Sequence, residues 1–209
     1  MKRKILAMAA ALLLAPMTAG LAQAAGGGYM GGYLIGKVGA YLPDESNVNT
    51  GFNGEIGFGF NLVPKPGLLA IEGTTGYFNA SQSSYYMGGG YQNYMKFQAD
   101  VVPLAVSLKA GIEARPFTFY VGGGFDLLFA SMEAKYRSLY YGRYSDSDND
   151  TVLGGHVMAG VTIDINPQMF IGAEVKYLAT QDVSMSLYGY ELTGDLNGVT
   201  VSGMLGIRF

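Results

Sequence analysis

The feature that most constrains this chain is an alternation of apolar and polar residues that recurs in eight separate segments. In the segment 152–165, Val157, Val161 and Ile163 share one parity, whereas His156 and Asp164 share the other with Gly and Thr. A spacing of two is the period of side chains along a β-strand. The alternating segments are 33–42, 52–62, 68–78, 94–113, 118–135, 152–165, 169–180 and 198–209. The sequence therefore predicts an all-β chain.

The connections between these segments alternate in length. Those at 63–67, 114–117 and 166–168 are tight and contain proline, whereas those at 43–51, 79–93, 136–151 and 181–197 are long and polar. Tight turns at one end and long loops at the other are typical of bacterial outer-membrane barrels, whose short turns lie on the periplasmic side. We therefore expect an eight-stranded antiparallel up-and-down transmembrane β-barrel with both termini on that side.

A soluble exported barrel with an apolar interior is the alternative to this arrangement. Its outer face would need many Lys and Glu, but charged residues make up only 14% of the chain, against about a quarter in ordinary soluble domains. Small polar residues instead suit the crowded lumen of eight strands. The apolar parity is therefore predicted to face lipid. Aromatic girdles are expected at Tyr77, Phe97, Tyr136 and Tyr177 near the long loops, and at Phe60, Phe119, Phe170 and Phe209 near the short turns.

The beginning of the chain has the pattern of an export signal. A basic start at 2–4 precedes an apolar run at 5–14 and the small residues Ala22 and Ala24. We expect residues 1–24 to be a signal peptide cleaved between Ala22 and Gly26, and 25–209 to form one barrel domain. Removing three cations changes the formal charge from 13 − 16 = −3 to 10 − 16 = −6, which argues against a nucleic-acid partner.

The stretch 101–129 (VVPLAVSLKAGIEARPFTFYVGGGFDLLF) and the closing strand resemble the small eight-stranded outer-membrane proteins of Gram-negative bacteria, of the OmpX, OmpA transmembrane-domain and OmpW type. The resemblance implies that the C-terminal aromatic strand, with Phe209, Ile207 and Leu205, is read by the barrel-assembly machinery. It also implies periplasmic chaperones, outer-membrane lipid and lipopolysaccharide as partners, and a monomer.

Some barrels of this architecture are enzymes, namely lipid A deacylases, palmitoyltransferases and omptin proteases. They use a histidine because proton transfer near neutral pH requires an imidazole. This chain has one histidine, His156, and Val157 and Met158 stand where the deacylase pattern has serine and asparagine. We therefore expect a luminal histidine hydrogen-bonded to a neighbour, and no enzyme.

The acidic stretch SDSDND at 145–150 spaces three aspartates like the start of a calcium loop. Thr151 replaces the glycine that such a loop needs, so we expect a solvated loop tip. No metal site and no cofactor are predicted.

A cluster of charges is predicted inside the barrel. If the first long loop is centred near 46–47, facing residues have numbers that sum to about 93, and Lys37 and Glu55 sum to 92. The cluster of luminal parity comprises Lys37, Glu55, Glu72, Asp126, Glu174 and Lys176. Because Asp100 and Lys109 differ in parity, a bulge is expected near Pro103.

Three functions remain open from the sequence. Tyrosines concentrate in the long loops, which favours a structural or surface-interaction barrel that uses Tyr85, Tyr86, Tyr140, Tyr141 and Tyr188. Luminal glycines would leave space for a narrow channel for small or apolar solutes, at Gly57, Gly59, Gly122, Gly124, Gly160 and Gly172. A lipid-modifying enzyme comes third.

Overall fold

The computed structural model describes residues 31–45, 48–63, 66–88, 91–138, 142–187 and 190–209, so the predicted signal peptide lies outside the described residues. The strands within these ranges are β1 (Gly32–Pro43), β2 (Gly51–Asn61), β3 (Gly67–Gly88), β4 (Tyr91–Ala114), β5 (Phe117–Ser138), β6 (Gly142–Asp164), β7 (Met169–Thr180), β8 (Val183–Leu187), β9 (Tyr190–Gly194) and β10 (Gly198–Arg208).

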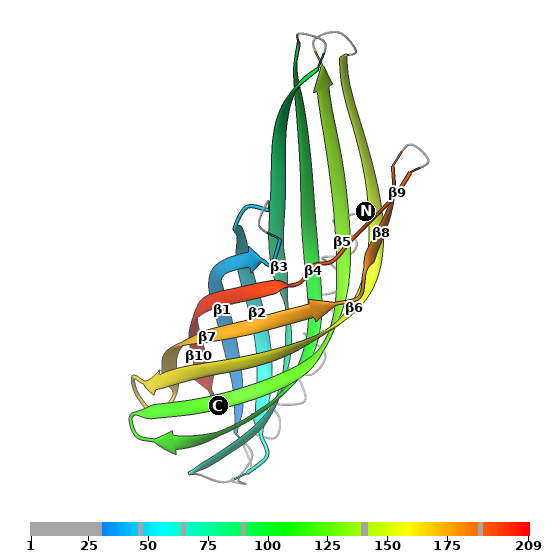
Figure 1. The fold of residues 1–209 in the computed structure, drawn as a ribbon. Coiled ribbons are helices and arrows are strands. Elements are labelled where there is room, and N and C mark those ends of the chain that lie inside the picture. The colour runs from blue at the N-terminus through cyan, green and yellow to red at the C-terminus, as the bar shows by residue number, and fades with distance from the viewer. Residues whose placement is uncertain (1–30, 46–47, 64–65, 89–90, 139–141, 188–189) are drawn as a thin grey trace.

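Eight of these strands close into one antiparallel barrel in the order β1-β10-β7-β6-β5-β4-β3-β2, which confirms the predicted fold class (Figure 1). The pairing of β1 with β10 closes the ring. Strands β8 and β9 form a separate two-stranded hairpin within the predicted fourth loop. No helix in the described ranges is long and apolar enough to cross a membrane.

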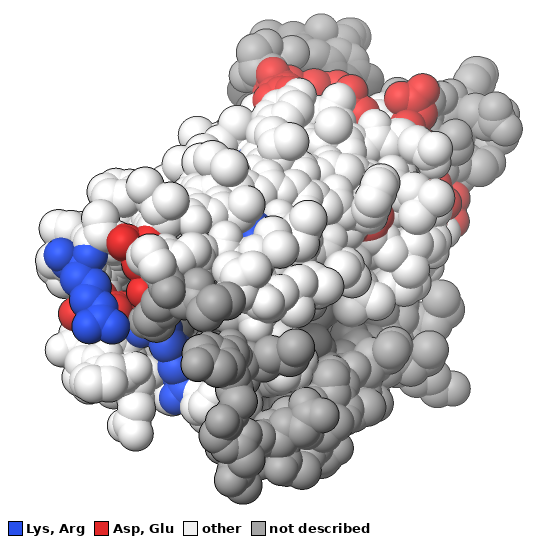
Figure 2. Space-filling model, turned by 90° about the horizontal axis from the view of Figure 1, so that it is seen from below, with Lys and Arg blue, Asp and Glu red and all other residues white. Residues whose placement is uncertain are grey.

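The two faces of the barrel differ as the alternation predicts. Large apolar side chains are exposed on the outside, for example Val106 at 59%, Val121 at 62% and Phe125 at 82%. The side chains of opposite parity point inward and are buried. The face shown in Figure 2 carries a wide, mostly uncharged band, with Lys, Arg, Asp and Glu gathered toward its ends. An apolar belt of this kind is suited to hydrocarbon.

Two of the predicted girdle aromatics have the wrong facing. Phe170 is buried in the lumen, with the Arg208 guanidinium 4.5 Å above its ring. Phe97 lines a pocket at the other end of the barrel. By contrast, Phe119 and Tyr177 are exposed on the outside at 51% and 40%. Phe170 has the luminal parity of Glu174 and Lys176, and its aromatic character does not change that facing. Phe97 would face outward only if β4 had a bulge near Pro103; in the regular strand it has the luminal parity of Lys109.

The predicted bulge at Pro103 is also wrong. Val102, Pro103 and Leu104 pair with Phe129, Leu128 and Leu127 without any change of register. Asp100 therefore lies on the outer face while Lys109 lies inside, and the hydroxyl of Tyr77 donates to the Asp100 carboxylate. The difference in parity reflects opposite faces of one regular strand.

Four strands are much longer than the alternation predicts. Strands β3, β4, β5 and β6 have 22, 24, 22 and 23 residues, whereas β1, β2, β7 and β10 have 11 or 12. Most of the predicted loops 79–93 and 136–151, including the aspartates of 145–150, are therefore strand. The parts of β3–β6 beyond the short strands form a sheet that rises from one side of the barrel (Figure 1). We call it the projecting sheet, its end of the barrel the projecting end, and the opposite end the short-turn end.

Apolar layers lie toward both ends of the lumen. The layer toward the projecting end includes Tyr41, Phe78, Val101, Leu128, Val152 and Leu178, and the layer toward the short-turn end includes Tyr33, Ile35, Tyr120, Met158, Phe170 and Met204. Charged side chains lie among and between these layers, so the lumen is packed with side chains in the described part of the chain.

Candidate functional site

The centre of the lumen holds a square of alternating charges. The Nζ of Lys37 on β1 lies 3.0 Å from Glu72 and 2.7 Å from Glu174, and the Nζ of Lys109 lies 2.8 Å and 3.1 Å from the same two carboxylates. Glu72 comes from β3, Lys109 from β4 and Glu174 from β7, so the square spans the barrel. Each side chain is at most 4% exposed. Two ammonium groups and two carboxylates leave no net charge at this level.

Tyrosine hydroxyls complete the coordination of the two carboxylates. Tyr33 donates to Glu72 over 2.8 Å, and Tyr120 donates to Glu174 over 2.7 Å. The Lys109 ammonium also lies 4.6 Å above the Tyr120 ring. Each carboxylate therefore accepts three side-chain hydrogen bonds, which is the saturation that a buried charge needs to be tolerated.

A separate ion pair joins two further residues of the predicted cluster, Glu55 and Lys176. Lys176 on β7 contacts Glu55 on β2, and Asn53 donates to Ser202 over 3.1 Å beside them. The predicted register of the first hairpin is confirmed, because Lys37 lies opposite Glu55. Lys37 nevertheless bonds to Glu72 and Glu174, and Glu55 bonds to Lys176. The backbone pairing was predicted correctly and the ionic partners were not.

The third polar group contains His156. Its Nε2 lies 2.9 Å from the Ser107 hydroxyl oxygen and its Nδ1 lies 2.5 Å from a carboxylate oxygen of Asp126. The expectation of a luminal histidine hydrogen-bonded to its neighbours is confirmed. Asp126 thus belongs to this group and does not join the square of charges.

A Ser-His-Asp array is the arrangement of serine hydrolases, so its surroundings decide what it can do. All three residues are buried, at 4% exposure or less. None of them lines either of the two pockets at the ends of the barrel. A nucleophile needs space for the tetrahedral carbon and donors for its oxyanion. In the described part of the chain this array orients a histidine, and neither of the two pockets opens onto its hydroxyl.

Glycines explain how the luminal side chains meet. Among the hydrogen bonds that join non-adjacent strands, three pass over a glycine on the strand between them: Tyr33 to Glu72 over Gly59, Tyr120 to Glu174 over Gly160, and Ser107 to His156 over Gly124. A Cβ added at Gly59 would collide with the Tyr33 ring, and one at Gly160 would collide with the Tyr120 ring. These two glycines therefore leave room for neighbouring side chains, and the space predicted there for a channel is filled.

The remaining predicted site residues are placed as follows. Leu205 and Ile207 face outward on β10, each 48% exposed, and Phe209 stacks on Phe58 with ring centroids 5.9 Å apart. Tyr85 and Tyr86 lie in strand β3. Tyr140, Tyr141 and Tyr188 lie outside the described residues. The sequence did not predict Lys109 as a member of the square or Tyr33 and Tyr120 as donors to it, although all three have luminal parity.

A closed antiparallel barrel with an apolar outer belt and buried polar groups in its lumen is the architecture of a membrane-spanning β-barrel protein. Comparison with known families agrees with the geometry. The chain belongs to the outer membrane protein beta-barrel domain family, whose model matches residues 7–209.

The solved structures to which the chain is similar are distant in sequence. A major outer membrane protein from Thermus thermophilus is 11% identical, with a TM-score of 0.56 over 87% of this chain and 100% of that one. Neisserial surface protein A (NspA) is 14% identical, with a TM-score of 0.49 over 87% and 98%. Ail, the attachment invasion locus protein of Yersinia pestis, is 13% identical, with a TM-score of 0.46 over 86% and 98%. No curated protein sequence matches the chain. The likeness to the Thermus protein concerns the fold alone.

Proposed function

We propose that the protein is a closed, non-enzymatic outer-membrane barrel that acts at the cell surface through its projecting sheet. The observation that carries this proposal is the contrast between a lumen filled by bonded side chains and four strands that continue beyond the barrel. In this proposal the projecting end is extracellular, and the beginning of β1 and the end of β10 lie on the periplasmic side. The protein is a monomer without cofactor, surrounded by outer-membrane lipid and lipopolysaccharide.

The projecting sheet has an edge at which a partner could pair. Strand β2 pairs with β3 as far as Phe78, and a single bridge joins Asn49 to Ser81. Beyond Ser81, no further strand of the described part pairs with that side of β3. Backbone N–H and C=O groups along such an edge form a ladder with an extended polypeptide. The partner is therefore a segment of another protein in extended conformation, bound along 82–88.

Shortening the β3–β4 hairpin is expected to remove this binding and spare the barrel. Replacing 84–95 by Asn-Gly joins the cross-strand partners Ser83 and Lys96 with a two-residue hairpin turn. The variant should still migrate differently in SDS before and after boiling, because the closed ring has no free edge from which to unfold. Its binding to an unfolded polypeptide immobilised on a sensor surface should fall to background.

The matched control shortens the β8–β9 hairpin, with 185–192 replaced by Asn-Gly between Ser184 and Thr193. This control variant should bind as the full chain does. Undiminished binding by the variant lacking 84–95 would reject the β3 edge as the contact surface.

The alternative function, a narrow channel, makes a different prediction about conductance. In planar bilayers the wild-type barrel should show no open steps with or without apolar solutes, because the square of charges and the apolar layers fill the lumen. Lys37→Ala should produce open steps in the current, since it removes the β1 side chain that bonds to both Glu72 and Glu174. Lys135→Ala, in an exposed pair with Glu133, is the matched control and should stay closed. Steady wild-type conductance would favour the channel.

A further inference from the structure

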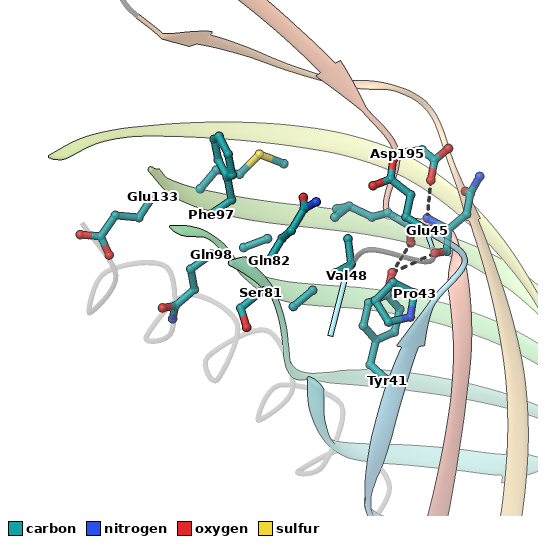
Figure 3. A pocket seen from close by; sticks show the side chains of 15 residues that line it. Tyr41, Pro43, Glu45, Val48, Ser81, Gln82, Phe97, Gln98, Glu133 and Asp195 are labelled. Carbon is teal, nitrogen blue, oxygen red and sulfur yellow. Dashed lines mark hydrogen bonds between the residues drawn. The ribbon is translucent and has the colours of Figure 1, made fainter. Parts of the chain in front are cut away.

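A pocket lies where the projecting sheet rises from the barrel (Figure 3). Its volume is about 140 Å³. An engineered apolar cavity of about 150 Å³ binds benzene, so this pocket has room for one ring or a branched alkyl group of similar size. It shares no lining residue with the smaller pocket of about 50 Å³ at the short-turn end.

The floor of the pocket is apolar because the hydroxyl of Tyr41 is hydrogen-bonded to the backbone. The Tyr41 hydroxyl donates to the backbone carbonyl oxygens of Leu196 and Asn197, over 2.8 and 3.2 Å. Tyr41 therefore presents its ring to the pocket and not its hydroxyl. Small side chains at Ala80 and Ala99 leave the space that larger residues would fill. Val48, Phe97, Met132 and Leu196 complete the apolar lining.

The rim of the pocket is acidic. Glu45 and Asp195 are exposed and stand beside the end of β1 (Figure 3). Among the described residues, no Lys, Arg or His lines the pocket. A third acid, Glu133, has the parity of the opposite face of the sheet and pairs there with Lys135 at 2.9 Å. The rim thus carries two carboxylates without a lining cation to offset them.

We propose that this pocket binds a small amphipathic cation, that is, an aromatic ring or branched alkyl group that bears an ammonium group. The apolar body would lie on Tyr41, Ala99 and Met132, where contact with water is lost. The ammonium group would lie between Glu45 and Asp195, where the charges are complementary. The pocket shares only Gln82 with the β3 edge and takes a different class of ligand, so it goes beyond the proposed surface function.

Binding can be measured by calorimetry on the full barrel in phospholipid nanodiscs, with phenethylamine as the probe. Two matched probes separate the contributions: 3-phenylpropanoate has the ring with a negative charge, and propylamine has the ammonium group without the ring. Empty nanodiscs correct for partition into lipid. We expect saturable binding of phenethylamine and much weaker binding of both matched probes.

Variants locate the binding on the protein. Glu45→Gln and Asp195→Asn should each weaken phenethylamine binding about two- to fivefold, the range for exposed ion pairs. Asparagine at 195 keeps an oxygen for the hydrogen bond from the Asn197 amide. Ala99→Leu should abolish binding by filling the pocket, with folding checked by the mobility shift in SDS. Asp182→Asn, at an exposed acid that does not line the pocket, is the control and should bind like the wild type. Equal affinity for 3-phenylpropanoate, or unchanged affinity in Ala99→Leu, would overturn the proposal.

Discussion

Replacing Glu72 with alanine is expected to lower the free energy of unfolding of the barrel by about 3–5 kcal/mol. Glu72 is fully buried and accepts hydrogen bonds from Lys37, Lys109 and Tyr33. Its removal leaves two buried ammonium groups to share one carboxylate, that of Glu174. A buried charge without its partner is costly, whereas the intact pair contributes little net stability, so the effect appears only when one partner is lost.

The measurement is denaturant unfolding in phospholipid vesicles, with Glu133→Ala as the matched control. Glu133 pairs with Lys135 at the surface, so its loss should cost less than about 1 kcal/mol. The double variant of Lys37 and Glu72 should be more stable than the sum of the single losses predicts, with a coupling above about 1 kcal/mol. If Glu72→Ala lowers the free energy of unfolding no more than Glu133→Ala does, water reaches the centre of the lumen. The proposal of a lumen closed by bonded side chains is then wrong.

Deleting Phe209 is expected to reduce assembly in the outer membrane far more than Ile207→Val does. The Phe209 amide donates to the Gly32 carbonyl oxygen over 3.0 Å, and the Gly32 amide donates back over 3.2 Å. These two bonds end the seam between β1 and β10. Their loss should cost about 1–3 kcal/mol, at about 0.5–1.5 kcal/mol for each bond. Ile207→Val on the lipid-facing side should change stability by less than about 0.5 kcal/mol.

Two assays distinguish the contribution of Phe209 to the β1–β10 pairing from its role as an assembly signal. Refolding of the purified chain into vesicles reports the seam alone, whereas the yield of assembled barrel in cells reports recognition as well. The assembly role predicts a deficit in cells that exceeds the deficit in vesicles. Equal deficits in both assays would leave Phe209 as a structural residue of the seam only.

The sequence predicted the barrel wherever one face meets lipid and the other meets the lumen. There the two faces need different residues, so parity predicts which way a side chain faces, and the centre of the first long loop correctly predicts Lys37 opposite Glu55. In the projecting sheet the sequence pattern did not predict the strands. In 81–86 (SQSSYY) every residue is polar or aromatic, and no alternation distinguishes strand from loop. Strand pairing there comes from the partner strand, which a local pattern does not contain.

The ionic partners were harder to predict for a geometric reason. Register identifies residues on adjacent strands, but Tyr33 reaches Glu72 two strands away because Gly59 between them has no side chain. A search for polar residues on both sides of a luminal glycine would have found this pair, and also Ser107 with His156 across Gly124.

The unequal strand lengths determine how far the protein reaches. Beyond the last pairs with β2 and β7, strands β3 and β6 continue over 82–88 and 142–153. At 3.4 Å per residue these stretches measure about 24 Å and about 41 Å along the strand. The headgroup layer on each side of a bilayer is only about 5–8 Å thick. In the proposed orientation both stretches are longer than the headgroup layer, so a folded protein as bulky as the barrel can approach the projecting sheet, while the pocket at its base admits only small molecules.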